Sequence, residues 1–230
     1  VNNTDGTCTA NITNNLSNRN ILINGGMIVN QRGNVTGQTG TQYNLDRFEL
    51  NVSNGGTWSV SQSTDTPDGF GSSCKLDCTT ADTSLGANDL VLFRQKLEGQ
   101  DLQAFSKGTS AAKQFILSFY VKTNKSGVYT VELQDGDNDR IASKTFTVSD
   151  GNWNRYSLVF PADTTGAFDN DNQESLDLKF WLAAGSTFTS GTLNTSSWAS
   201  KVNANRVSSS NVNLADSTSN EWYITGVQLE

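Results

Sequence analysis

Acidic residues at regular spacing are the first groups in the chain that could do chemistry. Asp135, Asp137 and Asp139 form the D-x-D-x-D opening of a calcium-binding loop. Such a loop has Gly at position six and Glu at position twelve, but this sequence has Arg140 and Phe146 there. Asp, Gly and Asn are also the residues that a tight turn between two strands requires. We therefore predict a hairpin turn, with the three Asp residues as weak calcium candidates and no other cofactor.

Residue types also decide which kinds of catalysis are open to the chain. The sequence contains no His, which excludes Ser-His-Asp and Cys-His catalysis, the HExxH zinc site and the facial iron triad. No glycine-rich phosphate loop precedes a helix-like stretch, and no pair of carboxylates stands out as a glycosidase pair. We therefore predict that the protein is not an enzyme, and we assign no catalytic residue.

Charge and hydropathy narrow the choice of partners. The formal net charge is −7 and Lys and Arg form no cluster, whereas nucleic-acid binders show a basic patch or stripe. No apolar run is long enough to cross a bilayer, and the first residues lack the basic and apolar regions of a signal peptide. We therefore expect no nucleic acid and no membrane insertion.

Short segments of alternating apolar and polar residues recur from Ile21 onward, between clusters of Gly, Asn, Asp and Ser. The predicted strands lie at 46–52, 57–63, 72–79, 90–98, 113–123, 128–134, 142–149, 154–162, 176–184 and 221–230. One stretch near 100–112 predicts at most one short helix. The sequence thus predicts an all-β fold, a single antiparallel β-sandwich (jelly roll) over 21–230, after a polar N-terminal arm or linker at 1–20.

The alternation assigns two faces to each strand. In 113–123, Phe115, Leu117, Phe119 and Val121 share the face that we predict to be buried. The opposite faces are mostly charged, as a solvated surface should be, but they also carry aromatic residues. The ligand or interface candidates on these outward faces are Trp181, Tyr120, Lys179, Lys122 and Glu132.

Trp181 has three interpretations: an oligomer interface, a glycan contact, or a buried second layer. The first is favoured, because two aromatic residues among charges of both signs resemble an interface with a polar rim. Adjacent strands would bring Tyr120 within reach of Trp181. We therefore predict a homo-oligomer that assembles through this face.

The three cysteines do not suggest a disulfide framework, because their number is odd. Cys74 and Cys78 fall on the same face of a predicted strand, with Leu76 between them. At about 3.3 Å per residue their Cα atoms lie too far apart for a disulfide. We predict that both are reduced and buried, while Cys8 belongs to the polar leader.

Several strings resemble one family of phage proteins. NRNILINGGMIVNQRG followed by YNLDRFEL resembles the opening of a domain found in tail-fibre and other virion structural proteins of marine bacteriophages, especially cyanophages. The similarity continues through DTTGAFDNDNQESLDLKFWLAAGS to VNLADSTSNEWYITGVQLE and covers nearly all of 19–230. It implies a virion-borne jelly roll like a carbohydrate-binding module, often trimeric and folded in the host cytoplasm. The family offers no agreed catalytic residue. Since its members usually continue beyond this point, the similarity also suggests a part of a longer product.

Three functions are compatible with these observations. We favour a non-enzymatic virion structural and adhesion module, most simply a tail-fibre domain that binds host surface glycans or is displayed toward them. Its partners would be further copies of the chain, in the trimer that the family implies. Other virion proteins and host cell-surface polysaccharide would be its further partners. The alternative is a capsid-decorating or architectural protein without a ligand. A polysaccharide depolymerase is less favoured, because phage depolymerases more often use β-helix repeats, which are absent here.

Overall fold

The structure is a computed structural model that describes residues 20–230. The predicted N-terminal arm at 1–20, except Asn20, and Cys8 within it lie outside the described residues. In the described part, no helix is long and apolar enough to cross a membrane.

Nearly all of the regular secondary structure in the described chain is β-strand, as predicted. The strands are β1 (Val35–Gln38), β2 (Thr41–Tyr43), β3 (Glu49–Ser53), β4 (Thr57–Ser63), β5 (Ser73–Thr80), β6 (Leu90–Glu98), β7 (Phe115–Thr123), β8 (Gly127–Asp135), β9 (Arg140–Val148), β10 (Asn154–Phe160), β11 (Glu174–Ala184), β12 (Ala199–Ser200) and β13 (Glu221–Leu229). The helical pieces are η2 (Gly99–Phe105), α1 (Ser186–Thr189), η3 (Asn203–Asn205) and η4 (Leu214–Asp216). The short helix expected near 100–112 is the 3₁₀ turn η2, and only the short strands β1, β2 and β12 had no predicted counterpart.

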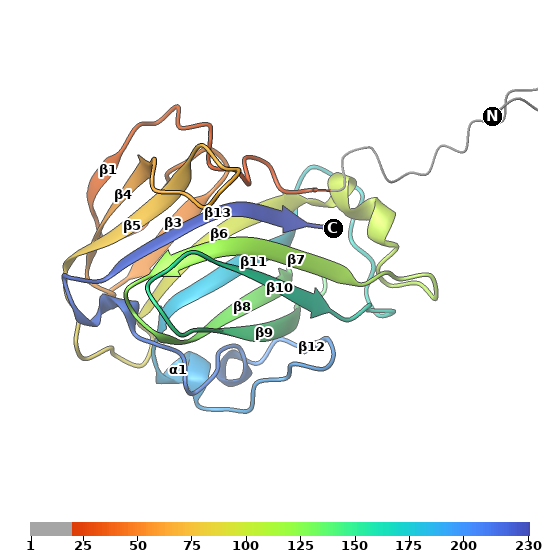
Figure 1. Ribbon diagram of the computed structural model, residues 1–230. Helices are drawn as coiled ribbons and strands as arrows, with labels where there is room; N and C mark the ends of the chain where they lie inside the picture. The colour runs from red at the N-terminus through yellow and green to blue at the C-terminus, as the bar shows by residue number, and fades with distance from the viewer. Residues whose placement is uncertain (1–19) are drawn as a thin grey trace, which may run out of the picture.

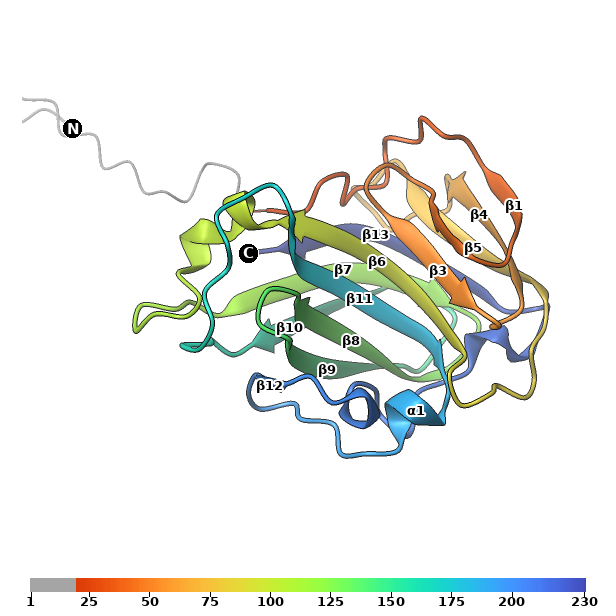
Figure 2. The ribbon, with the colours of Figure 1, turned by 180° about the vertical axis from the view of Figure 1, so that it is seen from behind.

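Two antiparallel sheets pack face to face and confirm the predicted sandwich (Figures 1 and 2). The first has six strands in the order β1-β4-β5-β13-β7-β10, and it lies in front in Figure 1. The second has seven strands in the order β12-β9-β8-β11-β6-β3-β2, and it lies in front in Figure 2. Each sheet therefore has an inner face toward the core and an outer face away from it.

The core between the sheets comes from the side chains that period-2 alternation assigned to the inner faces. Phe119 of the six-stranded sheet meets Phe180 of the seven-stranded sheet edge to face at 5.0 Å between ring centroids. Phe93 and Trp222 make a second contact of this kind across the sandwich, at 5.7 Å. Aromatic pairs in these arrangements add to the hydrophobic stabilisation of a core.

The two buried cysteines lie where the sequence placed them. Cys74 and Cys78 are free thiols on β5, and they point into the core on the same side as Leu76. Burial raises the pKa of both thiols, that of Cys78 to about 11. Thiols held in the protonated form are poor nucleophiles, so both cysteines act as small apolar core residues.

The first residues of the described chain, 20–26, form hydrogen bonds with the last strand, β13. Asn20 accepts a hydrogen bond from Leu229 N–H and donates one to Val227 O, and Val227 N–H donates to Gly25 O. A Cβ atom on Gly25 would lie 2.0 Å from Val227 O, so only Gly allows this close approach. The segment therefore joins the two ends of the described chain.

Candidate functional site

The seven-stranded sheet carries three of the predicted site residues, and the structure buries all of them. Trp181, Lys179 and Glu132 lie on the outer face of β11 and β8 and are at most 4% exposed. Residues 185–212, which we call the covering segment, fold back over this face and contain α1, η3 and β12 (Figure 2). The prediction that Trp181 is exposed is therefore wrong, and the buried second layer is the correct interpretation.

Specific contacts from the covering segment enclose Trp181. Phe188 packs on its ring at 5.2 Å between centroids, and Val207 completes the small apolar cluster. The Arg206 guanidinium lies 5.0 Å from the Trp181 ring centroid and donates hydrogen bonds to Glu132 at 2.7 and 2.9 Å. Alternation along a strand shows which side chains point outward, but it does not show whether a distant segment covers that face.

The other two predicted residues, Tyr120 and Lys122, belong to the six-stranded sheet. Tyr120 and Trp181 therefore lie on opposite outer faces of the sandwich, and the expectation that they are within reach of each other is wrong. Tyr120 packs against the ring of Phe70 at 5.3 Å between centroids. Lys122 forms an ion pair with Asp65 at 2.6 Å.

Two further aromatic residues, Tyr223 and Trp153, lie near Lys122 on this outer face, which the sequence alone did not predict. Tyr223 of β13 lies between Lys75 and Lys122, whose ammonium nitrogens are 5.6 and 5.5 Å from its ring centroid. Trp153 packs edge-on against Tyr223 and donates a hydrogen bond from Nε1 to Asp65 at 2.9 Å. The six-stranded sheet thus presents aromatic and charged groups on the same surface. The sequence did offer one indication, because alternation along the predicted strand 221–230 places Tyr223 on the outer face.

A hollow of about 330 Å³ lies at one end of the seven-stranded sheet, and we call it the edge pocket. It is formed by the loop before β1, by β2 and the turn before β3, by the end of β6 and by the start of β11. Its lining residues are Arg32, Tyr43, Asp46, Arg47, Lys96, Leu97, Glu98 and Glu174. Sequence analysis missed this site, because its residues come from four separate parts of the chain.

Opposite charges alternate around the edge pocket. Lys96 pairs with Glu174 at 2.7 Å. Two further pairs, Arg32–Asp46 and Arg47–Glu98, are looser at 3.5 Å. With three cations facing three anions, the pocket offers both donors and acceptors and has no net charge.

Tyr43 is the aromatic residue of the edge pocket. It lies on the short edge strand β2 opposite Glu49 and is 42% exposed, so a large part of its surface is open to a ligand. The Arg32 guanidinium lies 5.7 Å from the ring centroid, a distance at which a cation is attracted to the ring.

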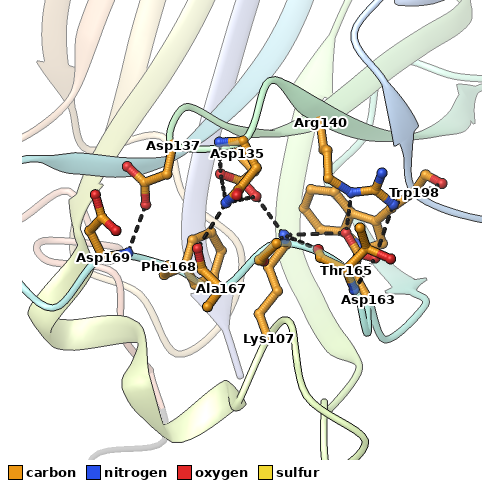
Figure 3. Close-up of polar contacts among 12 residues, drawn as sticks. Lys107, Asp135, Asp137, Arg140, Asp163, Thr165, Ala167, Phe168, Asp169 and Trp198 are labelled. Atoms are coloured by element: carbon orange, nitrogen blue, oxygen red, sulfur yellow. Dashed lines mark hydrogen bonds and ion pairs between the residues drawn. The ribbon is translucent and has the colours of Figure 1, made fainter.

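The calcium candidates lie at the β8–β9 hairpin turn that the sequence predicted, and each has a protein partner. Figure 3 shows the partners of Asp135 and Asp137. Asp135 pairs with Lys107, Asp139 pairs with Lys201, and Asp137 accepts a hydrogen bond from Asp169 N–H. Among residues 20–230, no group of three or more acidic or Cys side chains is arranged to hold a metal ion.

Comparisons with known proteins give structural likenesses only. No family model and no curated protein matches the sequence. One similar structure is the family 11 carbohydrate-binding module from Clostridium thermocellum in complex with a β-1,3-1,4-mixed-linked tetrasaccharide, at 12% identity and a TM-score of 0.41, covering 86% of this chain and 95% of that one. Another is a CBM4 structure, at 12% identity and a TM-score of 0.40, covering 90% and 97% of the two chains. A third is the C-terminal family 22 module of Clostridium thermocellum Xyn10B, at 12% identity and a TM-score of 0.39, covering 83% and 94%. These likenesses are distant and concern the fold.

Proposed function

We propose that this chain is a non-catalytic glycan-binding module of a phage virion, most simply a tail-fibre domain that contacts host surface polysaccharide. The observation that carries the proposal is the edge pocket, where the exposed ring of Tyr43 stands among paired acidic and basic side chains. The resemblance of the sequence to marine phage structural proteins supports the virion location and the assembly into homotrimers.

The chemistry of the edge pocket matches that of a sugar. One face of a pyranose ring is apolar and packs on an aromatic side chain, while its hydroxyl groups both donate and accept hydrogen bonds. Tyr43 offers the ring, and Arg47 and Glu98 offer a planar donor and a planar acceptor whose mutual contact at 3.5 Å is loose. Because cations and anions balance in the pocket, a neutral sugar fits better than a strongly anionic one.

The arrangement of the carboxylates supports binding rather than hydrolysis. A glycosidase needs one carboxyl group as an acid and a second as nucleophile or base across the scissile bond. Asp46, Glu98 and Glu174 each face a cation, and none of the three stands apart from the ion pairs of the pocket.

The experiment measures the binding of the purified chain to envelope polysaccharides of candidate hosts, on a glycan array and then by calorimetry. Tyr43→Ala should weaken binding by about fivefold, since a stacked ring contributes about 1 kcal/mol. Tyr43→Phe, which keeps the ring, should bind like the wild type.

Three results would contradict the proposal. A wild-type protein that binds no polysaccharide would overturn the glycan function, and release of reducing sugar would indicate a depolymerase. If Tyr43→Ala binds normally while Trp153→Ala does not, the ligand lies on the six-stranded sheet and the assignment to the edge pocket is wrong.

A further inference from the structure

Lys107 follows η2, and its charged end lies deep inside the protein. Its side chain is 1% exposed, and the Asp135 side chain beside it is fully buried. Nζ lies 2.5 Å from Asp135 Oδ2 and 3.2 Å from Asp163 Oδ2. It also donates hydrogen bonds to the carbonyl oxygens of Thr165 and Gly166, at 3.1 and 2.7 Å (Figure 3).

Aromatic rings and a second cation complete the surroundings of this lysine. The ring centroids of Phe168 and Trp198 lie 5.1 and 5.2 Å from Nζ, and both side chains are nearly buried. Arg140 holds Asp163 by hydrogen bonds at 2.7 and 3.0 Å. A buried ion pair is a poor source of stability, because desolvation of the two charges offsets their attraction. The arrangement therefore calls for another explanation.

We propose that Lys107 and Asp135 condense spontaneously to form an intramolecular amide bond, with Asp163 as the proton-transferring group. The proposal concerns a covalent modification and is independent of glycan binding. The reacting groups are already in contact, and such fixed proximity can replace much of the barrier that free amines and acids face.

The reaction balances without an oxidant or an activating co-reactant. The Lys107 ammonium first gives one proton to Asp135 Oδ2, which leaves a neutral amine beside a neutral carboxylic acid. The amine nitrogen then attacks Cγ of Asp135 and forms the N–C bond, while Asp163 takes a proton from that nitrogen. Asp163 passes this proton to the Oδ2 hydroxyl group, the C–Oδ2 bond breaks, and one water molecule leaves.

Neighbouring groups favour each step. Asp135 Oδ1, which carries the negative charge of the tetrahedral intermediate, accepts hydrogen bonds from Asn138 N–H at 3.0 Å and from its side-chain Nδ2 at 3.2 Å. Thr165 O and Gly166 O direct Nζ, and the aromatic rings keep bulk water away.

Asp163 is held in the form that can accept a proton. Burial by itself would raise the pKa of Asp163, but the hydrogen bonds from Arg140 and from Thr165 N–H and the charge of Lys107 outweigh it, so the pKa is lowered. Asp163 acts here as a catalytic base, since it contacts the reacting nitrogen directly.

The bond would connect the chain just after η2 to the last residue of β8. It would close the β7–β8 part of the chain into a covalent loop, which reduces the freedom of the unfolded state as a disulfide does. Unlike a disulfide, an amide bond survives in a reducing environment.

The test is the intact mass of the purified full chain, followed by tryptic mapping. The wild type should be lighter than its sequence mass by one water molecule. Trypsin should not cleave after Lys107, so residues 97–113 should be recovered joined to residues 126–140. Lys107→Arg and Asp135→Ala should show the full mass and separate peptides, and Asp163→Asn should react far more slowly.

Peptide mapping also separates this bond from a competing dehydration. Asp135 precedes Gly136, and an Asp-Gly pair can lose water within the backbone to form a succinimide. That product would leave cleavage after Lys107 intact and would persist in Lys107→Arg. Wild-type protein that is folded by circular dichroism but has the full sequence mass, or has unlinked peptides, overturns the proposal.

Discussion

Arg206 holds the covering segment against the seven-stranded sheet, and its replacement by Ala is the sharpest test of that architecture. The guanidinium donates two hydrogen bonds to Glu132 and lies over the rings of Trp181 and Phe188. Glu132 itself is completely buried. Arg206→Ala therefore leaves a buried carboxylate with Lys179 Nζ, at 3.4 Å, as its remaining cation.

The expected cost follows from that geometry. Removal of one partner of a buried ion pair destabilises a protein by about 3–5 kcal/mol, because the other charge stays desolvated. Since Lys179 still compensates part of the charge, we expect a loss near the lower end, about 3 kcal/mol. The measurement is the free energy of unfolding in urea, followed by circular dichroism and Trp fluorescence.

The pH dependence of this loss has a definite sign. Burial alone would raise the pKa of Glu132, but the hydrogen bond from Arg206 and the charges of Lys179 and Arg206 lower it below its usual value. A carboxylate with a lowered pKa stabilises the fold above its unfolded pKa of about 4.3, and the contribution disappears as pH falls through the folded pKa. The deficit of Arg206→Ala should therefore be full at neutral pH and shrink below pH 4.

A control variant separates the effect of the unpaired Glu132 charge from the effect of the lost Arg206 packing. Adding Glu132→Gln to Arg206→Ala removes the unpaired charge, so the double variant should be more stable than Arg206→Ala alone. If the free energy of unfolding of Arg206→Ala lies within about 0.5 kcal/mol of the wild-type value, as for a surface substitution, then Arg206 does not hold the covering segment in place.

The remaining predictions concern the core and the assembly. Cys78→Ser should destabilise the fold by about 1–3 kcal/mol through burial of a hydroxyl group, which urea unfolding measures. The thiols of Cys74 and Cys78 in the native wild type should resist labelling, and rapid modification of both would contradict their burial. Trp181→Ala should lower the free energy of unfolding by about 3–5 kcal/mol without altering the subunit number of the folded protein. Tyr120→Ala should shift the predicted homotrimer toward monomer, and light scattering measures the subunit number of both variants. A wild type that is monomeric at high concentration would refute the trimer.

The strands were predictable because each buries one face and alternation then has a period of two residues. Phe115, Leu117, Phe119 and Val121 are all fully buried on the inner face of β7. The short strands β1 and β2 escaped prediction, because three or four residues at a sheet edge need no apolar face.

The candidate site was harder to predict, because it depends on which distant segments meet. Alternation placed Lys179 and Trp181 on the outer side of β11, which is correct, but it could not show that residues 185–212 return to cover them. Nothing next to Lys107 in the sequence marks its contact with Asp135, since the two groups meet only when the ends of η2 and β8 converge.

The proposed glycan contact and the proposed subunit contact fall on different parts of the sandwich. The covering segment encloses the β8 and β11 side of the seven-stranded sheet, but Tyr43 and the edge pocket remain open at the other end of that sheet. Tyr120 and Trp153 lie on the six-stranded sheet, so copies that associate through this face would leave every edge pocket outside the interface. A trimer would then present its three edge pockets together. Because linked sites have a high effective concentration, the avidity for a repetitive host polysaccharide would rise without any new contact. Disruption of the trimer should accordingly reduce adhesion to whole cells far more than it reduces the affinity of one pocket for a short oligosaccharide.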